Sequence, residues 1–262
     1  MLNKLERTHI TDKNNNTIKC ETKITEYSKK GFTFFKKEKV TMQNLIIDSR
    51  IRKIEYDYLT KYFNVIKLPL SKNVYEEISG HSDIFYTKIN DDVICAPNSE
   101  IINDIFKIGQ AKVENTYPND VLYNVCQIGD KIIGSKYTDK SIKPDIIVKQ
   151  GYVKCSITVT SNNSCITTDK KIADIMSENG IDALYIEENN IKLLKKDSTV
   201  SDMKGFIGGA TLVFNNKFIL FGDINKLQSK NEIIEHLNKY NLNLIDFKDL
   251  DVYDYGSGII YD

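Results

Sequence analysis

The stretch GHSDIFYTKINDDVICAPN, residues 80–98, contains the arrangement on which the fold prediction rests. It begins with a glycine, continues as an apolar segment at 84–89, turns at the polar residues NDD, and resumes as the short apolar run VIC. Two apolar runs separated by a short polar turn predict a β-hairpin. The same order of a kink with glycine or asparagine, a strand, a polar turn and a second strand recurs along the chain.

Five units with this order follow one another after residue 44. Each begins with an apolar first strand, and in most units a helical pattern follows. A second strand, a kink and a third strand come next, and four of the third strands lead into the next unit. The predicted first strands start at residues 45, 93, 132, 165 and 218. The predicted helices are 51–63, 99–109, 169–180 and 229–241, with none in the third unit, where Pro144 prevents a long helix. The predicted second strands are 65–70, 112–117, 145–150, 182–186 and 242–247, and the third strands are 80–89, 117–128, 150–160, 205–214 and 254–261.

Units that cannot bury their own helix face predict stacking around a common axis, with the last strand paired to the first. The predicted fold class is therefore α/β, as a five-unit pseudo-symmetric α/β propeller in one domain over residues 44–262. An open α/β sheet without pseudo-symmetry is the alternative for the same elements. Residues 1–43 lie outside the repeat, and we expect an N-terminal extension, partly disordered at its Asn-rich start, with one or two added strands.

The composition narrows the classes of partner. Lys+Arg and Asp+Glu both number 36 in 262 residues, so no overall basic field points to nucleic acid. Residues 1–43 carry ten basic against five acidic side chains, a modest surplus that is typical of a solvated segment. No apolar run reaches the roughly 18 residues of a membrane span, and the N-terminus lacks the apolar core of a signal peptide. We expect a cytoplasmic protein without a membrane partner.

The five cysteines are odd in number, widely spaced and mostly within apolar runs, which predicts reduced thiols. No pair has CxxC spacing and the histidines are far apart in sequence, so neither a metal nor another cofactor is expected. Cys95, Cys126 and Cys165 are predicted to be buried core thiols. His236, on a polar helix face, and His9, in the N-terminal extension, are predicted to be surface residues.

The candidate site residues lie in the kinks. His81 and Asp83 begin a predicted strand, and alternation along that strand would direct both side chains to the same side. Cys155 lies in the segment GYVKCS, and Asp120 in the segment YPND, at the corresponding kinks of other units. In a closed ring these kinks, and the glycines of GFIGG, would converge near the axis. The alternatives are a buried core thiol for Cys155 and local hydrogen bonding in turns for the two aspartates.

A ring of such units resembles the pentein fold, the α/β propeller of arginine deiminases, agmatine deiminases, dimethylarginine hydrolases and amidinotransferases. That fold also serves a non-catalytic ribosome-binding initiation factor. HSDIF (81–85) resembles the HxD motif of the deiminases, and GYVKCS (151–156) resembles their segment with the nucleophilic cysteine. In those enzymes the cysteine lies in the last repeat, whereas Cys155 lies in the third unit. The chain is also similar to a family of uncharacterised bacterial proteins that share the HxD, PND and QGYxKCS segments.

The resemblance implies a cysteine-dependent hydrolase or transferase, of amidinohydrolase or amidinotransferase type, that acts on a guanidino or amidine small molecule. Cys155 would be the nucleophile, His81 the acid/base, and Asp83 and Asp120 the anchors of the cation. Such chemistry needs a thiolate, a proton carrier and carboxylates. Further substrate-binding positions expected at the kinks are Asn119, Lys154, Gly208 and Gly209. The alternative is a non-catalytic pentein-like protein that binds a small ligand or a protein partner.

Overall fold

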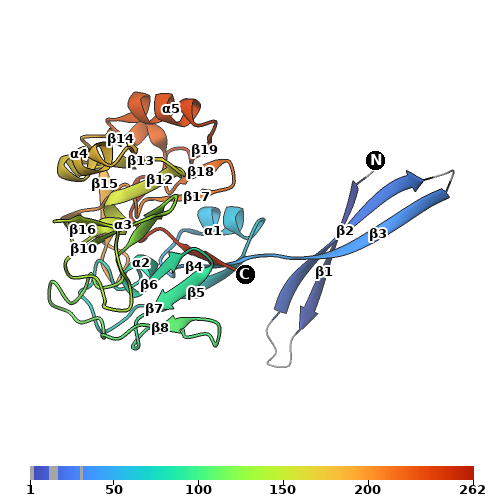
Figure 1. Ribbon diagram of the computed structural model, residues 1–262, viewed down its shortest axis with the longest axis horizontal. Coiled ribbons are helices and arrows are strands. Elements are labelled where there is room, and N and C mark those ends of the chain that lie inside the picture. The colour runs from blue at the N-terminus through green and yellow to red at the C-terminus, as the bar shows by residue number, and fades with distance from the viewer. Residues whose placement is uncertain (1–2, 12–16, 30–31) are drawn as a thin grey trace.

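The computed structural model describes residues 3–11, 17–29 and 32–262, with side chains from residue 42 onward. Within these residues the chain is a mixed α/β structure, with many short strands in three-stranded sheets and few helices (Figure 1). No helix of the described part has both the length and the apolar composition needed to cross a membrane.

The N-terminal extension contains three strands where the sequence predicted one or two. β1 (Asn3–Thr11), β2 (Thr17–Lys29) and β3 (Phe32–Thr41) form an antiparallel sheet in that order. Figure 1 shows this sheet outside the group formed by the other sheets. The Asn-rich stretch for which disorder was predicted falls largely within 12–16, outside the described residues.

Five other sheets share one strand order, in which a middle strand pairs antiparallel with one neighbour and parallel with the other. The antiparallel neighbour is called the inner strand here and the parallel neighbour the outer strand. The middle strands are β4 (Asn44–Asp48), β7 (Asp92–Cys95), β10 (Lys131–Ser135), β13 (Ser164–Thr167) and β18 (Lys217–Leu220). The inner strands are β21 (Ile259–Tyr261), β6 (Tyr86–Ile89), β9 (Cys126–Ile128), β12 (Ile157–Ser161) and β17 (Thr211–Phe214). The outer strands are β5 (Asn64–Leu68), β8 (Lys107–Ile108), β11 (Ile146–Val148), β14 (Asp182–Tyr185) and β19 (Asn243–Ile245).

Four of the inner strands lead directly into their middle strands through the predicted hairpin turns. Asn90, Gly129 and Asn215 have φ of 54°, 60° and 54° in three of these turns. This left-handed conformation is typical of two-residue hairpins, where asparagine and glycine are favoured. The fifth inner strand, β21, is the C-terminal strand of the chain, and it pairs antiparallel with β4, with Ile259 opposite Ile46.

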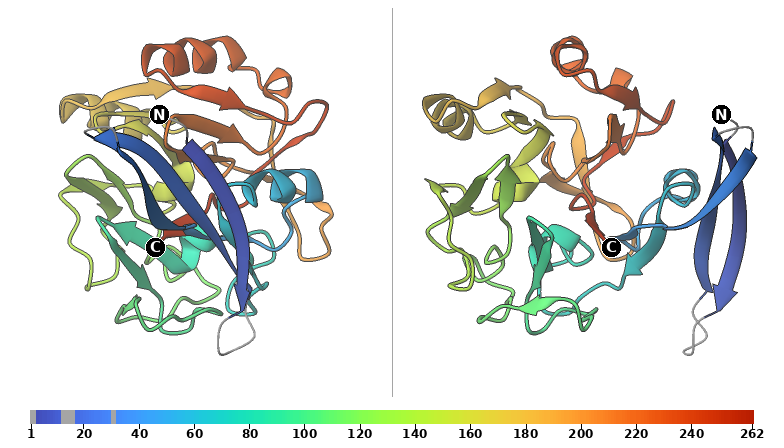
Figure 2. Two further views of the ribbon diagram at one scale, coloured as in Figure 1. Left: turned by 90° about the vertical axis from the view of Figure 1, so that its right-hand side faces the viewer. Right: turned by 45° about the vertical axis from the view of Figure 1, so that its right-hand side comes forward.

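Neighbouring inner strands contact one another and share hydroxyl hydrogen bonds. Thr87 in β6 donates to the carbonyl of Val125, just before β9, at 3.0 Å. The hydroxyls of Thr158 in β12 and Thr211 in β17 lie 2.7 Å apart, and Ser257, just before β21, donates to the Thr211 carbonyl at 2.7 Å. Residues of all five inner strands line one cavity of about 660 Å³. Figure 2 shows the small sheets spread around this region.

Three of the four predicted helices are present. They are α1 (Lys53–Leu59), α4 (Lys170–Glu178) and α5 (Lys230–Lys239). The predicted N-cap Asp169 accepts hydrogen bonds from the N–H groups of residues 171 and 172, and Gly180 beyond the helix has φ of 77°. Buried side chains of these helices join the strand residues in separate hydrophobic clusters, as Ile172 and Met176 of α4 do with Ile133.

The helix predicted at 99–109 is absent, which makes that prediction wrong. Residues 99–106 form turns and bends, and the outer strand β8 (Lys107–Ile108) replaces the strand predicted at 112–117. Side chains form hydrogen bonds with backbone groups of this segment and of the residues that follow it. The Tyr86 hydroxyl bonds to both the N–H and the carbonyl of Ile101, and the Asn98 amide bonds to both groups of Val113. Ile105, in the middle of the predicted helix, is 61% exposed.

A further sheet lies outside the predicted units. It contains β15 (Ile191–Leu194), β16 (Val200–Lys204) and β20 (Val252–Tyr253). β15 pairs in parallel with β20, so the segment between the fourth and fifth units is joined to the C-terminal part of the chain.

Candidate functional site

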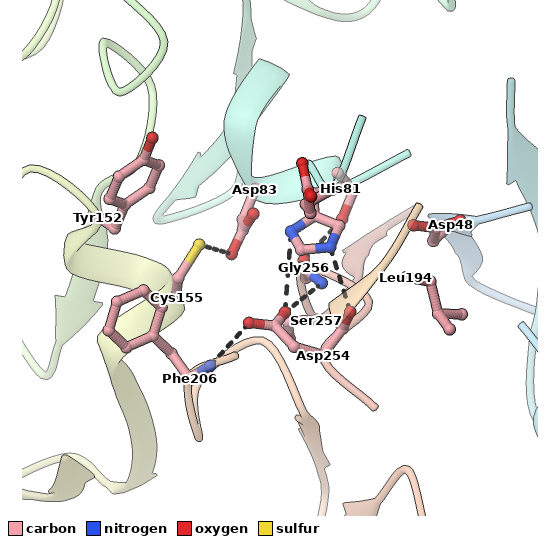
Figure 3. Close-up of polar contacts among 12 residues, drawn as sticks. Asp48, His81, Asp83, Tyr152, Cys155, Leu194, Phe206, Asp254, Gly256 and Ser257 are labelled. Atoms are coloured by element: carbon pink, nitrogen blue, oxygen red, sulfur yellow. Dashed lines mark hydrogen bonds and ion pairs between the residues drawn. The ribbon is translucent and has the colours of Figure 1, made fainter. Parts of the chain in front are cut away.

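Two kinks of the repeat bring a histidine, an aspartate and a cysteine together. A ring nitrogen of His81, a carboxylate oxygen of Asp83 and the sulfur of Cys155 all lie within 4.8 Å of one another. All three side chains are at least 98% buried. Figure 3 shows the Asp83 carboxylate between the sulfur and the imidazole. The structure thus places the three residues that the sequence predicted as catalytic at one point.

The reason for this convergence differs from the one the sequence suggested. Residues Ser82–Phe85 form a single helical turn, α2, instead of the start of a strand, and His81 is its N-cap residue. The side chains of His81 and Asp83 are therefore directed by a turn and not by strand alternation. Val153–Ser156 form the equivalent turn α3, which carries Cys155. Each turn leads directly into an inner strand, so the turns lie at the same end of β6 and β12, which both contact the inner strand β9.

Asn124 holds the cysteine in place and was not identified from the sequence. Its side-chain oxygen accepts the backbone N–H groups of Lys154 and Cys155 at 2.7 and 3.2 Å. Its amide nitrogen donates to the Asp83 carbonyl at 3.0 Å and to the Cys155 sulfur at 3.2 Å. The Cys155 thiol in turn donates to Asp83 Oδ2 at 3.0 Å. The only sequence signal for this role is a polar residue just before the inner strand β9, in YNVC.

Asp254 is a second functional candidate that the sequence predictions missed. Its backbone carbonyl lies 3.1 Å from His81 Nε2, and its Oδ1 lies 3.7 Å from His81 Nδ1. The carboxylate accepts the N–H groups of Phe206 and Gly256 at 2.8 and 2.9 Å. The only sequence signal for Asp254 is its position in the kink DYGSG of the fifth unit. His81, Asp83, Cys155 and Asp254 are called the site cluster below.

Asp120 contacts the N-cap residue of the turn that carries Cys155, and Asn119 does not. Asp120 is 1% exposed, and its Oδ2 accepts the Tyr152 hydroxyl at 2.5 Å. Tyr152 is the N-cap residue of α3 and shares a further hydroxyl hydrogen bond with Tyr75 at 2.8 Å. Asn119 is exposed and donates to Glu114 at 3.0 Å. The structure therefore gives Asn119 no contact with the site cluster.

The remaining predicted positions support the cysteine through the backbone. A Cβ atom on Gly208 would lie 2.5 Å from the Cys155 carbonyl oxygen, and one on Gly209 would lie 1.9 Å from Asp254 Oδ1. The Gly209 N–H donates to the Cys155 carbonyl at 3.1 Å. These glycines permit the close backbone approach that the sequence predicted for GFIGG. Lys154 lines the 660 Å³ cavity at the inner strands.

Burial shifts the pKa of each group in the site cluster toward its uncharged form. Burial raises the pKa of the Cys155 thiol well above its usual value, and the nearby carboxylates of Asp83 and Asp254 raise it further. Burial also raises the pKa of Asp83, and it raises that of Asp254 to about 7. The pKa of His81 is well below its usual value because of burial and of the positive charge on Arg50. Near neutral pH the cluster therefore holds a thiol and a neutral imidazole.

Several buried polar atoms at the site lack a hydrogen-bond partner. They are His81 Nδ1, Asp83 Oδ1 and Asp120 Oδ1. In the part of the chain with described side chains, no lysine or arginine forms an ion pair with Asp83, Asp120 or Asp254. Buried polar atoms without partners are uncommon in folded proteins. A cation bound at this site would supply the missing partners.

The other cysteines and histidines fit the predictions in part. Cys95, Cys126 and Cys165 are buried, as predicted for core thiols. His236 is only 7% exposed, so its predicted surface position is wrong. It lies one helical turn from the buried Ile233, and its Nε2 bonds to a threonine hydroxyl of β12 at 2.9 Å. Cys20 and His9 lie among the residues whose side chains the structure does not describe.

Comparisons with known proteins place the chain in a family without assigning it an activity. No curated protein and no solved structure matches the chain. One family model matches residues 46–260, which extend from the middle strand β4 to the last inner strand β21. The match leaves out the N-terminal sheet and includes every residue of the site cluster. The chain therefore belongs to a family of unknown function, DUF6873.

Proposed function

We propose that residues 44–262 form a pentein-like α/β propeller whose site cluster is that of a cysteine-dependent hydrolase or transferase of a guanidino or amidine compound. The propeller is supported by five sheets of equal strand order and by the pairing of the last inner strand with the first middle strand. It is also supported by the cavity that all five inner strands line. An open sheet would leave its first and last strands unpaired with each other.

The observation that carries the function is a thiol, an imidazole and carboxylates buried together, with oxygen atoms that have no partner. A guanidinium ion is planar and offers several N–H donors in fixed directions. Asp83 Oδ1 and Asp120 Oδ1 are free acceptors for such donors. The rings of Tyr152 and Phe206, both half-buried, stack 6.3 Å apart at the border of the site. Aromatic faces stabilise a cation on its way into a buried site.

The hydrogen bonds of His81 support a role as the proton acceptor. A backbone carbonyl can only accept, so the 3.1 Å contact between His81 Nε2 and the Asp254 carbonyl places the imidazole proton on Nε2. Nδ1 then carries a lone pair and can accept the proton of Cys155. The positive charge of a bound guanidinium would lower the pKa of that thiol and so promote the transfer. A substrate has to displace the hydrogen bond between Cys155 and Asp83, because the three groups lie within 4.8 Å of one another.

The reaction balances as a double displacement at the guanidinium carbon. The Cys155 sulfur bonds to the carbon while its proton passes to His81 Nδ1, and the amine that leaves takes this proton. Water then adds to the carbon of the S-linked intermediate and gives a proton to His81. The carbon–sulfur bond breaks with its electron pair returning to sulfur, which takes back the proton held by His81, and the excess proton of the ureido product passes to the released ammonia. Hydrolysis thus converts a guanidinium group and water into a ureido group and ammonium, whereas transfer uses an amine in place of water.

Ammonia release tests the proposal directly. Arginine-like and agmatine-like compounds are incubated with the protein in the presence of a chelator, beside Cys155→Ala and the matched core variant Cys126→Ala. We expect turnover by the unmodified chain and by Cys126→Ala, and none by Cys155→Ala. His81→Gln should lower kcat by about 10²–10⁴-fold, since a general acid/base is lost. Turnover that survives in Cys155→Ala would reject the thiol mechanism.

A second candidate is a non-catalytic protein that binds a small cation at the same site. The observation that favours it is the burial of Cys155, which raises the thiol pKa and so keeps the sulfur protonated. This candidate predicts that agmatine-like compounds raise the Tm without release of ammonia. It also predicts that Asp83→Asn removes this stabilisation, because the anchoring charge is lost.

A further inference from the structure

The site cluster presents three different metal-ligand types with their donor atoms close together. Among the residues with described side chains, His81, Asp83 and Cys155 are the one group of this kind, and their donor atoms lie within 4.8 Å of one another. The sequence predicted no metal site, because these residues have no ligand spacing along the chain. The turns α2 and α3 bring them together only in the folded protein. We propose that His81, Asp83 and Cys155 bind one divalent ion of the zinc type, a property that does not depend on the proposed reaction.

The tautomer of His81 suits a metal. Its Nε2–H donates to the Asp254 carbonyl, which leaves the Nδ1 lone pair without a partner. A backbone carbonyl that fixes the other ring nitrogen is the usual arrangement around a metal-bound histidine. In Figure 3 the Nδ1 side of the ring faces Asp83 and Cys155.

The surroundings of the Asp83 carboxylate and of the Cys155 sulfur also favour metal binding. Asp83 Oδ1 is buried and has no partner, while its Oδ2 accepts the thiol proton. The Asn124 amide donates to the Cys155 sulfur at 3.2 Å, which stabilises a thiolate. Metal binding releases the thiol proton to solvent and forms a metal–sulfur bond, with no change of oxidation state.

The ligand set selects among metals. Thiolate and imidazole ligands with a single carboxylate favour Zn²⁺ or Co²⁺ over Mg²⁺ and Ca²⁺, which prefer oxygen ligands. Three protein ligands leave a fourth tetrahedral position for water or another group. The ion would occupy the place of the guanidinium cation, so Zn²⁺ would inhibit the proposed reaction by competition.

Co²⁺ is the probe that reports on the ligands. Chelator-treated protein is titrated with Co²⁺, and the absorption of the sulfur-to-cobalt charge transfer is followed. We expect one equivalent to bind, Zn²⁺ to displace it, and Mg²⁺ to leave it in place. Cys155→Ser should abolish the charge-transfer absorption, and His81→Gln and Asp83→Asn should each weaken binding by at least about tenfold.

Two matched variants and one labelling experiment complete the test. Cys126→Ser changes another buried thiol, and Asp120→Asn another buried carboxylate, so both should keep the charge-transfer absorption. If a variant fails to fold, protection of Cys155 from iodoacetamide by Zn²⁺ in the unmodified chain, read by peptide mass spectrometry, gives the same information. A charge-transfer absorption that is missing, or that survives in Cys155→Ser, rejects the site, and so does alkylation of Cys155 that Zn²⁺ leaves unchanged. Ammonia release without metal binding rejects the metal site alone, and metal binding without ammonia release rejects the reaction alone.

Discussion

Two buried aspartates, Asp48 and Asp83, lie near the same kink, and they differ in whether the protein supplies a positive charge beside them. Asp48, at the end of β4, forms an ion pair with Arg50 at 2.6 Å, with the two side chains 0% and 3% exposed. Arg50 also donates to the carbonyls of Leu194 and Glu77. In the site cluster, Asp83 has a thiol as its side-chain partner and one free oxygen.

Under the proposed function, the difference separates a structural carboxylate, Asp48, from a ligand-binding carboxylate, Asp83. A buried charge is stable when the fold supplies the opposite charge and further hydrogen bonds, as it does for Asp48. Carboxylates without such partners cost stability, which a protein retains at sites where a ligand supplies the partner. Substitutions in the Asp48–Arg50 pair should therefore lower the free energy of unfolding. Substitutions in the site cluster should mainly lower the proposed activity or ligand binding.

The largest effect on stability is expected from Arg50→Met. This change leaves the carboxylate of Asp48 buried without its counter-charge, and we expect a loss of about 3–5 kcal/mol in the free energy of unfolding. Urea denaturation measures it. Lys53→Met, which removes an exposed ion pair with Asp57, is the control and should cost less than about 1 kcal/mol. Equal losses in the two variants would contradict the assignment of the Arg50 pair as structural.

The next largest effect is expected from alanine at a crowded glycine. Gly256 has φ of 66°, and a Cβ there would lie 2.4 Å from the Cβ of His81. Gly180 has φ of 77° with open space around it, so alanine there meets only the backbone penalty of about 1–2 kcal/mol. We expect Gly256→Ala to cost about 1–3 kcal/mol more than Gly180→Ala, because of the overlap. Thermal unfolding of the two variants checks this, and equal Tm values would show that His81 moves freely.

Asp83→Asn should leave stability unchanged or raise it by about 1–2 kcal/mol at pH 8. Burial raises the pKa of Asp83, so its ionised form opposes folding above the usual pKa, and asparagine removes that charge. The control is Asp139→Asn, since Asp139 is buried but accepts hydrogen bonds from residues 110, 111 and 141, which lower its pKa. Urea denaturation should show destabilisation of about 1–3 kcal/mol there. Equal destabilisation by Asp83→Asn and Asp139→Asn would contradict the view that the charge of Asp83, unlike that of Asp139, opposes folding.

The smallest effect concerns acid pH. Burial lowers the pKa of both His81 and His236, so the unfolded chain binds protons that the folded chain does not. Stability is therefore retained above pH about 6.5 and falls below it, by at most about 1.4 kcal/mol per pH unit for each histidine. His81→Gln should remove more of this slope than His236→Gln, because only His81 is fully buried and faces Arg50. Urea denaturation between pH 5 and 7, with a chelator present, measures both slopes, and a steeper loss in His81→Gln would contradict this sign.

The sequence predicted best those elements whose structure depends on residues close together in the chain. The hairpin turns, the five middle strands and three of the helices could be predicted, because apolar periodicity and turn residues act over a few neighbouring residues. The absence of a helix at 99–109 could not be predicted, since the Tyr86 hydroxyl, on a strand earlier in the chain, bonds to both the carbonyl and the N–H of Ile101. His236 was misplaced for a similar reason, because its partner lies on β12.

The residues of the candidate site also fall into those that the sequence could identify and those that it could not. His81, Asp83 and Cys155 could be selected from the sequence, because residue type and a neighbouring glycine mark them within a repeated kink. Asn124 and Asp254 could not, because nothing in their local sequence separates them from ordinary turn residues. Only the folded structure brings Asn124 to the sulfur and Asp254 to the imidazole. The protonation of the cluster is also a tertiary property, since burial and charges from distant segments change the pKa values.

By itself, then, the sequence determined the hairpins that join successive units, the five middle strands and the selection of His81, Asp83 and Cys155 as candidate site residues. These depend on interactions between residues close in the chain. The tertiary structure alone decided that the kinks are helical turns, that their side chains meet, and that the carboxylates there lack a counter-charge. Those properties depend on which distant segments share a buried space, where an unpaired charge is costly and a bound cation becomes favourable.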